Sequence, residues 1–365
     1  MAVQRFQVGT AESVPGAYAY GVVPVLDLPT GGQETIPVII AQGREDGPVL
    51  WVTANIHGGE LTGIASIHRL LAQNDLPRQM RGTAIFLPTI NPAGLRVMQR
   101  YPYYEQRDPN RVWPAPPSGE APSTRPPGIY EAIASVVYEL IVGSNPTALL
   151  DLHNASIDSI PFTIRDRVLY HDEDQRREAE ELARKLDELA KAFGLSLVNE
   201  SAAAKYVDLQ LHRSVAGSVV NTARVPALTL ELGMGMAIHP PAVSAGTRGI
   251  ANVMRYLGML DGQPRPVDEV PVVDLGFPVR RDDSARAPVS GVVEMLIEPG
   301  QSFTEGDLLG RMLDIYGRPL EGGEIPASAD GWLIGWSNGI AKYRGQVVAS
   351  LAVRDQDPLI DAYPQ

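Results

Sequence analysis

The stretch Val49–Glu60, VLWVTANIHGGE, predicts a buried strand that runs into a turn and presents two polar side chains there. An asparagine and two glycines interrupt the apolar run, and glycine adopts backbone angles that other residues resist. Apolar residues at helical spacing follow over residues 61–72 and predict a helix. His57 and Glu60 therefore lie at the end of a strand, which is the edge where open α/β sheets place their ligand sites.

The composition is that of an ordinary globular protein. The chain has 365 residues, of which 44% are hydrophobic, so it can form a full core. No apolar run approaches the ~20 residues that cross a bilayer, and the N-terminus has no hydrophobic signal core. We therefore expect a cytoplasmic protein without a membrane partner. The formal net charge of −12 disfavours nucleic acid as a partner. With no cysteine, any metal site must use nitrogen and oxygen ligands.

The order of the predicted elements indicates an α/β fold. Residues 17–42 alternate as in a β hairpin, and residues 201–221 are ambiguous with loop character. The other predicted strands and helices cover residues 83–88, 147–152 and 225–232 (strands) and 130–142, 171–193 and 242–260 (helices). We expect a mixed twisted sheet flanked by helices over residues 1–262. Beyond a change of composition near residue 263, short β runs broken by glycines predict a small all-β domain over residues 263–365.

Three predicted strand ends carry polar side chains. The first has His57 and Glu60, the second has His153, and the third has Glu231. Taken singly, each has a structural alternative, since a histidine in an apolar stretch is more often part of the core and Glu231 could cap a helix. Together they match a catalytic zinc, which takes three ligands of the His₂Glu type and keeps one open position. A further carboxylate beside such a site can serve as general base.

A proline-rich segment runs from Tyr101 to Pro127 with little helical or strand periodicity. Loops of this length in compact domains are usually functional or disordered. This one contains Asp108-Pro109-Asn110-Arg111. On their own, these residues could simply form a turn beside proline, and the arginines of the segment could face solvent.

The motifs HGGE, DLHN and TLELG, in this order and at these separations, resemble those of the metallocarboxypeptidase clan. Within it they are most similar to the succinylglutamate desuccinylase/aspartoacylase family. The resemblance covers about residues 40–260, and a trailing β domain is also a feature of that family. It implies a zinc carboxypeptidase-like fold with one zinc per chain, held by His57, Glu60 and His153. It also implies that Glu231 takes a proton from the attacking water and passes it to the leaving amine.

The same resemblance implies roles in the proline-rich segment. Asn110 and Arg111 match the pair that holds a substrate carboxylate, which suits a forked guanidinium. Asp108 matches the carboxylate that hydrogen-bonds the far nitrogen of the first zinc histidine and fixes its tautomer.

Arg100 falls where the family places an arginine that polarises the scissile carbonyl. The residues before the Asn-Arg pair, Gln106–Pro109, depart from the usual glycine-aspartate-leucine pattern of the family. Arg107 is therefore a rival for the role of Arg100.

The leading hypothesis is a zinc-dependent amidohydrolase that removes the acyl group from a small N-acyl amino acid. A metallocarboxypeptidase acting on peptides would share every metal ligand, although a trailing domain argues against a groove open to long peptides. A non-catalytic protein that retains zinc is the third alternative. The β tail resembles half of a biotinyl- or lipoyl-type sandwich, but Lys342 lacks the hairpin-tip context of a carrier lysine, so we expect a structural or gating domain. The acyl group, the amino acid and the oligomeric state stay open, a homo-oligomer included.

Overall fold

A computed structural model describes residues 3–73, 75–115, 125–155 and 158–364 of the chain. Part of the proline-rich segment, residues 116–124, lies outside this description. The largest element of the described residues is a sheet of thirteen strands. Twelve of them follow one another in the order β3 (Ala17–Asp27), β4 (Gln33–Gln42), β6 (Thr83–Leu87), β5 (Val49–Ala54), β7 (Ala148–Ala155), β12 (Ala227–Met234), β9 (Phe162–Arg165), β11 (Ser196–Asn199), β13 (Val279–Asp282), β20 (Ala349–Arg354), β18 (Gly331–Trp336) and β15 (Ser302–Phe303). The thirteenth, β8 (Asp158–Ser159), pairs with β18.

The centre of this sheet is parallel, and its margins are antiparallel. β5 pairs in parallel with β6 and β7, and β7 pairs in parallel with β12. All six residues of β5 are buried, as expected for a parallel strand covered on both faces. β3 and β4 pair antiparallel, which confirms the predicted hairpin. The mixed, twisted α/β sheet expected from the sequence is therefore present.

The helices lie between and beside these strands, and α8 packs against both α1 and α5. Their bounds are α1 (Thr62–Gln73), α2 (Leu76–Gln79), α3 (Pro92–Val97), α4 (Ile129–Gly143), α5 (Glu173–Phe193), α6 (Ala203–Asp208), α7 (Val215–Asn221) and α8 (Pro240–Tyr256), with single 3-10 turns η1 (Pro109–Arg111) and η2 (Leu211–Arg213). α5 ends where predicted, because Gly194 adopts φ +95° at its C-terminus. No helix within the described ranges is long and apolar enough to cross a membrane.

The segment 201–221 is more helical than its loop-like sequence indicated, since it contains α6, η2 and α7. These helices are too short to show a periodic apolar face, and short helices depend on tertiary packing for their stability. α7 packs on β7 and β12, and its N-terminus is capped by Ser214, whose Oγ accepts a hydrogen bond from Gly217 N.

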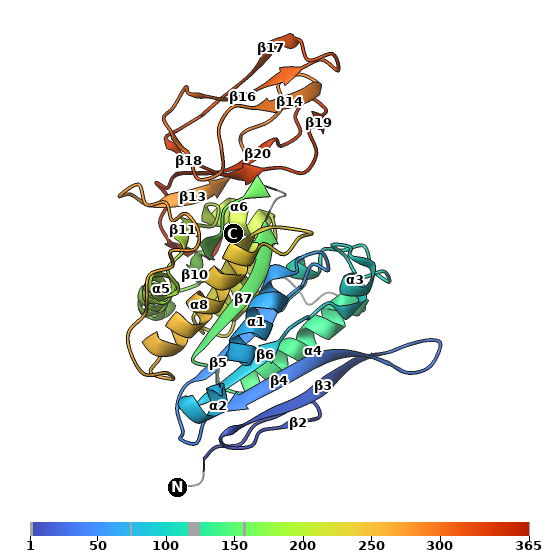
Figure 1. Ribbon diagram of the computed structural model, residues 1–365, viewed down its shortest axis with the longest axis vertical. Coiled ribbons are helices and arrows are strands. Elements are labelled where there is room, and N and C mark those ends of the chain that lie inside the picture. Colours follow the sequence, from blue (N-terminus) through green and yellow to red (C-terminus); the bar gives the residue numbers. More distant parts are fainter. Residues whose placement is uncertain (1–2, 74, 116–124, 156–157, 365) are drawn as a thin grey trace.

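The C-terminal part of the chain is all-β, as predicted. β14 (Gly291–Met295), β16 (Leu308–Leu313), β17 (Pro319–Pro326) and β19 (Ala341–Lys342) form a four-stranded sheet. Figure 1 shows this sheet as a lobe at one end of the molecule, with the β3–β4 hairpin at the other. β13, β20 and β18 of the same region continue the central sheet through the pairing of β13 with β11. The division into domains at residues 262 and 263 stays a prediction.

Two small pairings complete the fold. β1 (Gln7–Val8) pairs with β2 (Ala11–Glu12), and β21 (Ile360–Ala362) near the C-terminus returns to pair with β10 (Val168–Tyr170). The side chain of Arg167, directly before β10, is fully buried and lies 3.0 Å from the carboxylate of Asp355. Its guanidinium also donates to the backbone oxygens of Asp357 and Pro358, so it fastens the C-terminal segment to the α/β part.

Candidate active site

The turn after β5 is held by the side chain of Asn55, which adopts φ +58°. Its amide nitrogen donates to the backbone oxygens of His57, Gly58 and Glu60 at 3.1, 3.2 and 2.8 Å. A Cβ at Gly58 would lie 2.0 Å from the carbonyl carbon of Gly94, so only glycine fits beside that backbone. The turn therefore places the side chains of His57 and Glu60 in one fixed arrangement before α1 begins.

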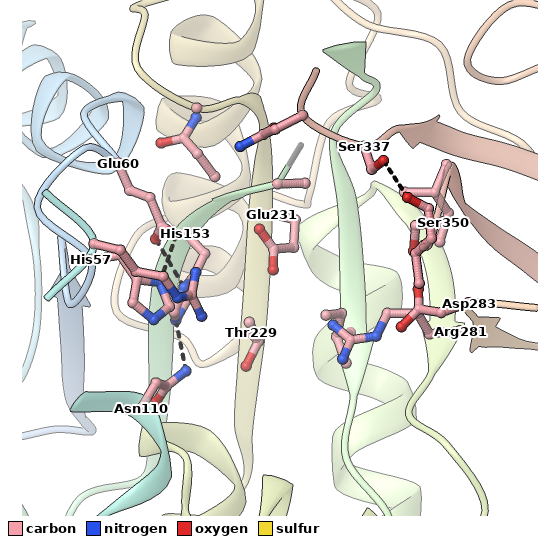
Figure 2. Close-up of a pocket in the computed structure, with 18 of the residues that line it drawn as sticks. His57, Glu60, Asn110, His153, Thr229, Glu231, Arg281, Asp283, Ser337 and Ser350 are labelled. Carbon is pink, nitrogen blue, oxygen red and sulfur yellow. Dashed lines mark hydrogen bonds and ion pairs between the residues drawn. The ribbon is translucent and has the colours of Figure 1, made fainter. Parts of the chain in front are cut away.

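His57, Glu60 and His153 form a buried group whose ligand atoms all lie within 4.8 Å of one another. Oε1 of Glu60 lies 2.6 Å from Nδ1 of His57, and Oε2 lies 3.0 Å from Nδ1 of His153. Figure 2 shows the three side chains meeting on one side of a cavity. The strand ends of β5 and β7 are neighbours in the parallel sheet, which is why residues about a hundred positions apart in the chain converge here.

A carboxylate lies behind each imidazole. Nε2 of His57 is 3.1 Å from Oδ1 of Asp108, and Nε2 of His153 is 2.7 Å from Oδ2 of Asp151. With a proton on Nε2, each ring donates to its carboxylate and leaves the Nδ1 lone pair directed at the centre of the group. Both histidines are therefore oriented as metal-binding histidines require.

Asp151 was missed by the analysis of the sequence. The signal was present, because alternate residues of a strand face the same side and Asp151 lies two positions before His153 in β7. Its other oxygen accepts a hydrogen bond from Oγ1 of Thr53 on β5 at 2.6 Å. Asp151 is thus fixed on both sides.

The charges of this group depend on one another. Burial opposes ionisation of Glu60, but the charges of the nearby His57 and His153 outweigh it and lower the pKa of Glu60. Burial also opposes protonation of His153, yet Asp151 and Glu60 raise its pKa well above the usual value. For Asp108, the penalty of burial is outweighed by His57 and then Arg100, so its pKa is lowered.

The donor set fits a divalent metal ion of the zinc type. It offers two imidazole nitrogens and one carboxylate, the composition of many catalytic zinc sites. Although Oε2 of Glu60 is close to His153, it has no hydrogen bond of suitable geometry among the described residues. The same negative charges that favour a proton on His153 would favour a cation in its place, since metal binding displaces ligand protons.

Glu231 stands beside this group on β12. It is the register partner of His153 on β7, so the two residues lie on adjacent strands at the same level. Its Oε2 is buried and has no hydrogen-bond partner among the residues described, and burial raises the pKa of its carboxyl group. In Figure 2 the Glu231 side chain points into the cavity between the two histidines and Arg281. Glu231 is thus a carboxylate in the lining of the cavity with one oxygen that no described residue pairs.

The proline-rich segment contributes the side chains of Asn110 and Arg111 to the cavity, and Arg100, directly before the segment, contributes a third. Oδ1 of Asn110 accepts from Val215 N at 2.9 Å, which anchors η1 to α7. Nη1 of Arg111 donates to the backbone oxygen of Asn110 at 2.6 Å. Nη2 of Arg100 contacts Oδ2 of Asp108 at 2.7 Å.

The rival arginine, Arg107, does not line this cavity. Its guanidinium lies 3.4 Å from Glu131 and 3.9 Å from Glu105, near the start of α4. The position of Arg100 beside the metal group therefore makes it the better candidate for contact with a substrate carbonyl.

Comparison with known proteins agrees with this geometry. A sequence model described as the succinylglutamate desuccinylase/aspartoacylase catalytic domain matches residues 46–257, more than half of the chain. The chain belongs to this family. Its members are deacylating amidohydrolases, and the catalytic-domain match spans the metal group, the proline-rich segment and Glu231.

Individual members of the succinylglutamate desuccinylase/aspartoacylase family are similar over nearly the whole chain. The N-alpha-acetyl-L-2,4-diaminobutyric acid deacetylase of Halomonas elongata is 27% identical over 321 residues, which cover 84% of this chain and 84% of that protein. The crystal structure of a succinylglutamate desuccinylase/aspartoacylase from Rhodobacter sphaeroides has a TM-score of 0.70 at 22% identity, covering 93% of this chain and 95% of that chain. The product-bound ectoine utilization protein EutE (DoeB) from Ruegeria pomeroyi has the same TM-score and identity over 92% and 95%. The two structural similarities show a shared fold.

The C-terminal strands also line the cavity of this desuccinylase/aspartoacylase family member, which was not predicted from the sequence. The cavity has a volume of about 970 Å³, and its lining includes Arg281 of β13, Asp283, Ser337, Lys342 and Ser350. Figure 2 shows the Arg281 side chain pointing toward the side of the cavity that holds Glu231. No motif marks these residues, because their place depends on the pairing of β13 with β11.

Proposed function

We propose that this protein is a zinc-dependent deacylase that hydrolyses the amide bond of a small N-acyl amino acid. The observation that carries the proposal is the buried His57–Glu60–His153 group with the unpaired carboxylate oxygen of Glu231 beside it. Membership of a family of N-acyl amino acid deacylases supports the same reaction class. A zinc ion held by the three side chains would lower the pKa of a bound water to about 7 and polarise the amide carbonyl.

Glu231 is the proposed proton carrier of the reaction. A general base must ionise near the working pH, and burial raises the pKa of Glu231 toward that range. It would accept a proton from the attacking water and then donate it to the nitrogen of the leaving amino acid. Its unpaired Oε2 supports this role, because a carboxylate engaged in a structural hydrogen bond would be less free to exchange protons.

Two of the arginines that line the cavity support the placement of the substrate. Arg111 and Asn110 would hold the carboxylate of the amino acid, for which a forked guanidinium is suited. Arg100, fixed by Asp108, would donate to the carbonyl oxygen of the scissile amide as negative charge develops on it. Asp108 would thus position both the arginine and His57.

The C-terminal strands support a small substrate over a peptide. They contribute Arg281, Ser337 and Lys342 to the lining of the cavity, and Figure 2 shows Arg281 and Ser337 across the cavity from the metal group. These side chains would restrict the space for a long peptide. A metallocarboxypeptidase remains the alternative that shares every metal ligand.

The test combines metal analysis with an assay of acetyl-, succinyl- and formyl-amino acids on the zinc-loaded protein. We expect about one zinc per chain in the wild type and hydrolysis of at least one N-acyl amino acid. His57→Ala should lose both zinc and activity, and Glu231→Gln should lose activity alone. His68→Ala is the matched control, because His68 is exposed on α1 and outside the cavity. Full hydrolysis by both site variants would overturn the proposal. Zinc binding without hydrolysis of any substrate would favour the non-catalytic alternative.

A further inference from the structure

Two buried carboxylates lie in the wall of the cavity but have no part in the proposed chemistry. Asp166 follows β9, and Glu200 follows β11, the parallel neighbour of β9, so the strand ends bring them to the same edge of the sheet. Their exposed fractions are 2% and 3%, and both line the cavity that contains the metal group. Burial of two acidic side chains side by side is costly unless a cation or proton donors compensate it.

The compensation within the described residues is incomplete. Oδ1 of Asp166 accepts a hydrogen bond from the hydroxyl of Tyr206 at 2.7 Å, but its buried Oδ2 has no partner there. Glu200 accepts from the backbone nitrogen of Ser201 at 3.0 Å and lies 3.3 Å from Nη2 of Arg281. The guanidinium groups of Arg281 and Arg111 both act on this acidic pair, but one carboxylate oxygen, Oδ2 of Asp166, is left without a donor among the described residues.

This acidic pair lies close enough to Arg111, the proposed partner of the substrate carboxylate, for their charges to interact. Burial and the charge of Glu200 raise the pKa of Asp166 to about 7, while Arg281 and Arg111 act in the opposite direction. Glu200 in turn acts on the guanidinium of Arg111, the proposed partner of the substrate carboxylate. A substrate whose carboxylate is held by Arg111 would thus have its amino-acid half near the acidic pair.

We propose that Asp166 and Glu200 form a subsite for an ammonium group on the side chain of the amino acid. The preferred substrates are then Nα-acyl diamino acids, an assignment that rests on the proposed deacylase function. A side-chain ammonium group gives Oδ2 of Asp166 the donor that the described residues do not supply, and its positive charge favours the ionised form of that carboxylate. A neutral amino-acid side chain on the substrate leaves Oδ2 of Asp166 unpaired. An acidic side chain on the substrate is repelled by the two carboxylates.

The first test compares substrates that differ only in that charge. Nα-acetyl derivatives of 2,4-diaminobutyrate, ornithine and lysine are assayed beside those of 2-aminobutyrate, norvaline and norleucine. We expect kcat/KM to favour the charged member by about tenfold or more for at least one pair, as for loss of one hydrogen bond to a charged group. Hydrolysis without such a preference in any pair would overturn the subsite and leave the deacylase function standing.

The second test removes the charge from the protein. Asp166→Asn keeps an oxygen for the Tyr206 hydroxyl, and it should reduce the charged-to-neutral ratio about tenfold. Asp187→Asn is the matched control, because Asp187 pairs with Arg165 on the neighbouring surface and does not line the cavity. Its ratio should equal that of the wild type. An unchanged ratio in a folded Asp166→Asn protein would overturn the proposal.

Two further measurements keep the proposal testable if Asp166→Asn does not fold. Glu200→Gln retains an acceptor for Ser201 N and should also lower the ratio. Calorimetric titration of the wild type with the free amino acids needs no turnover, and tighter binding of 2,4-diaminobutyrate or ornithine than of the uncharged analogues supports the subsite. Such selective binding in a protein that hydrolyses none of the substrates would refute the deacylase function and leave the subsite standing. Equal binding of charged and neutral amino acids would overturn the subsite.

Discussion

Oδ1 of Asp108 lies 3.1 Å from Nε2 of His57, while the other oxygen of the same carboxylate contacts Arg100 at 2.7 Å. One side chain thus orients a candidate metal ligand and a candidate carbonyl-polarising arginine at once. Asp108 also accepts a hydrogen bond from Asn110 N at 2.9 Å, so it fixes the first turn of η1. The proline-rich segment thus reaches the metal group through Asp108 at His57 and through Asn110, whose Nδ2 lies 3.5 Å from Nε2 of His153.

We predict that Asp108→Asn weakens zinc binding by about 10- to 100-fold, because an uncharged partner no longer fixes the tautomer and basicity of His57. The zinc dissociation constant, measured by competition with a chromogenic chelator, checks this. Asp261→Asn, in a surface pair with Arg81, serves as the control and should bind zinc like the wild type. Equal zinc affinity in all three proteins would show that Asp108 does not support the metal.

Glu231→Gln should separate catalysis from metal binding. The amide cannot carry a proton between water and leaving group, so we expect kcat to fall by about 100-fold or more. Zinc stoichiometry should stay that of the wild type, because Glu231 is not among the three clustered ligands. If the variant loses zinc together with activity, Glu231 belongs to the metal site and the proton-carrier role is wrong.

Arg167→Met should destabilise the protein by about 3–5 kcal/mol, because the carboxylate of Asp355 is then left buried without its charged partner. Denaturant unfolding followed by circular dichroism gives the free energy of unfolding. Arg176→Met removes an exposed pair with Glu173 on α5 and should change the same quantity by less than about 1 kcal/mol. Similar losses in the two variants would contradict the role of Arg167 as the fastening of the C-terminal segment.

The stability of the protein should fall with rising pH through Asp166. Its pKa is raised from 3.8 to about 7 in the folded state, so the folded protein binds a proton between these values that the unfolded chain has lost. The free energy of unfolding should therefore decrease from about pH 4 to pH 7, by at most about 1.4 kcal/mol per pH unit from this group, and level off above. Asn at this position does not titrate. The free energy of unfolding of Asp166→Asn should therefore rise relative to that of the wild type over the same pH range. A pH-independent difference would place the pKa of Asp166 near its ordinary value.

Local patterns in the sequence were sufficient for most of the fold. The alternation over residues 17–42 and the apolar run before His57 predicted β3, β4 and β5, because period-two patterns and glycine turns act over a few residues. The grouping of His57, Glu60 and His153 also followed from the sequence, since parallel strand ends meet at one edge of a sheet. The short helices of residues 201–221 did not follow, because packing on β7 and β12, and not helical periodicity, stabilises them.

The tertiary structure alone decided the rest of the site. Asp151 acquires its role only because β7 pairs with β5, which brings Thr53 to its other oxygen. Arg281 reaches the cavity through the pairing of β13 with β11, and Asp166 and Glu200 become a pair only through β9 and β11. The sequence by itself determined which residues end strands and carry ligand chemistry, because those signals are local. Which side chains meet across the cavity depends on which distant strands pair and in what register. That pairing is set by the burial of the whole hydrophobic core.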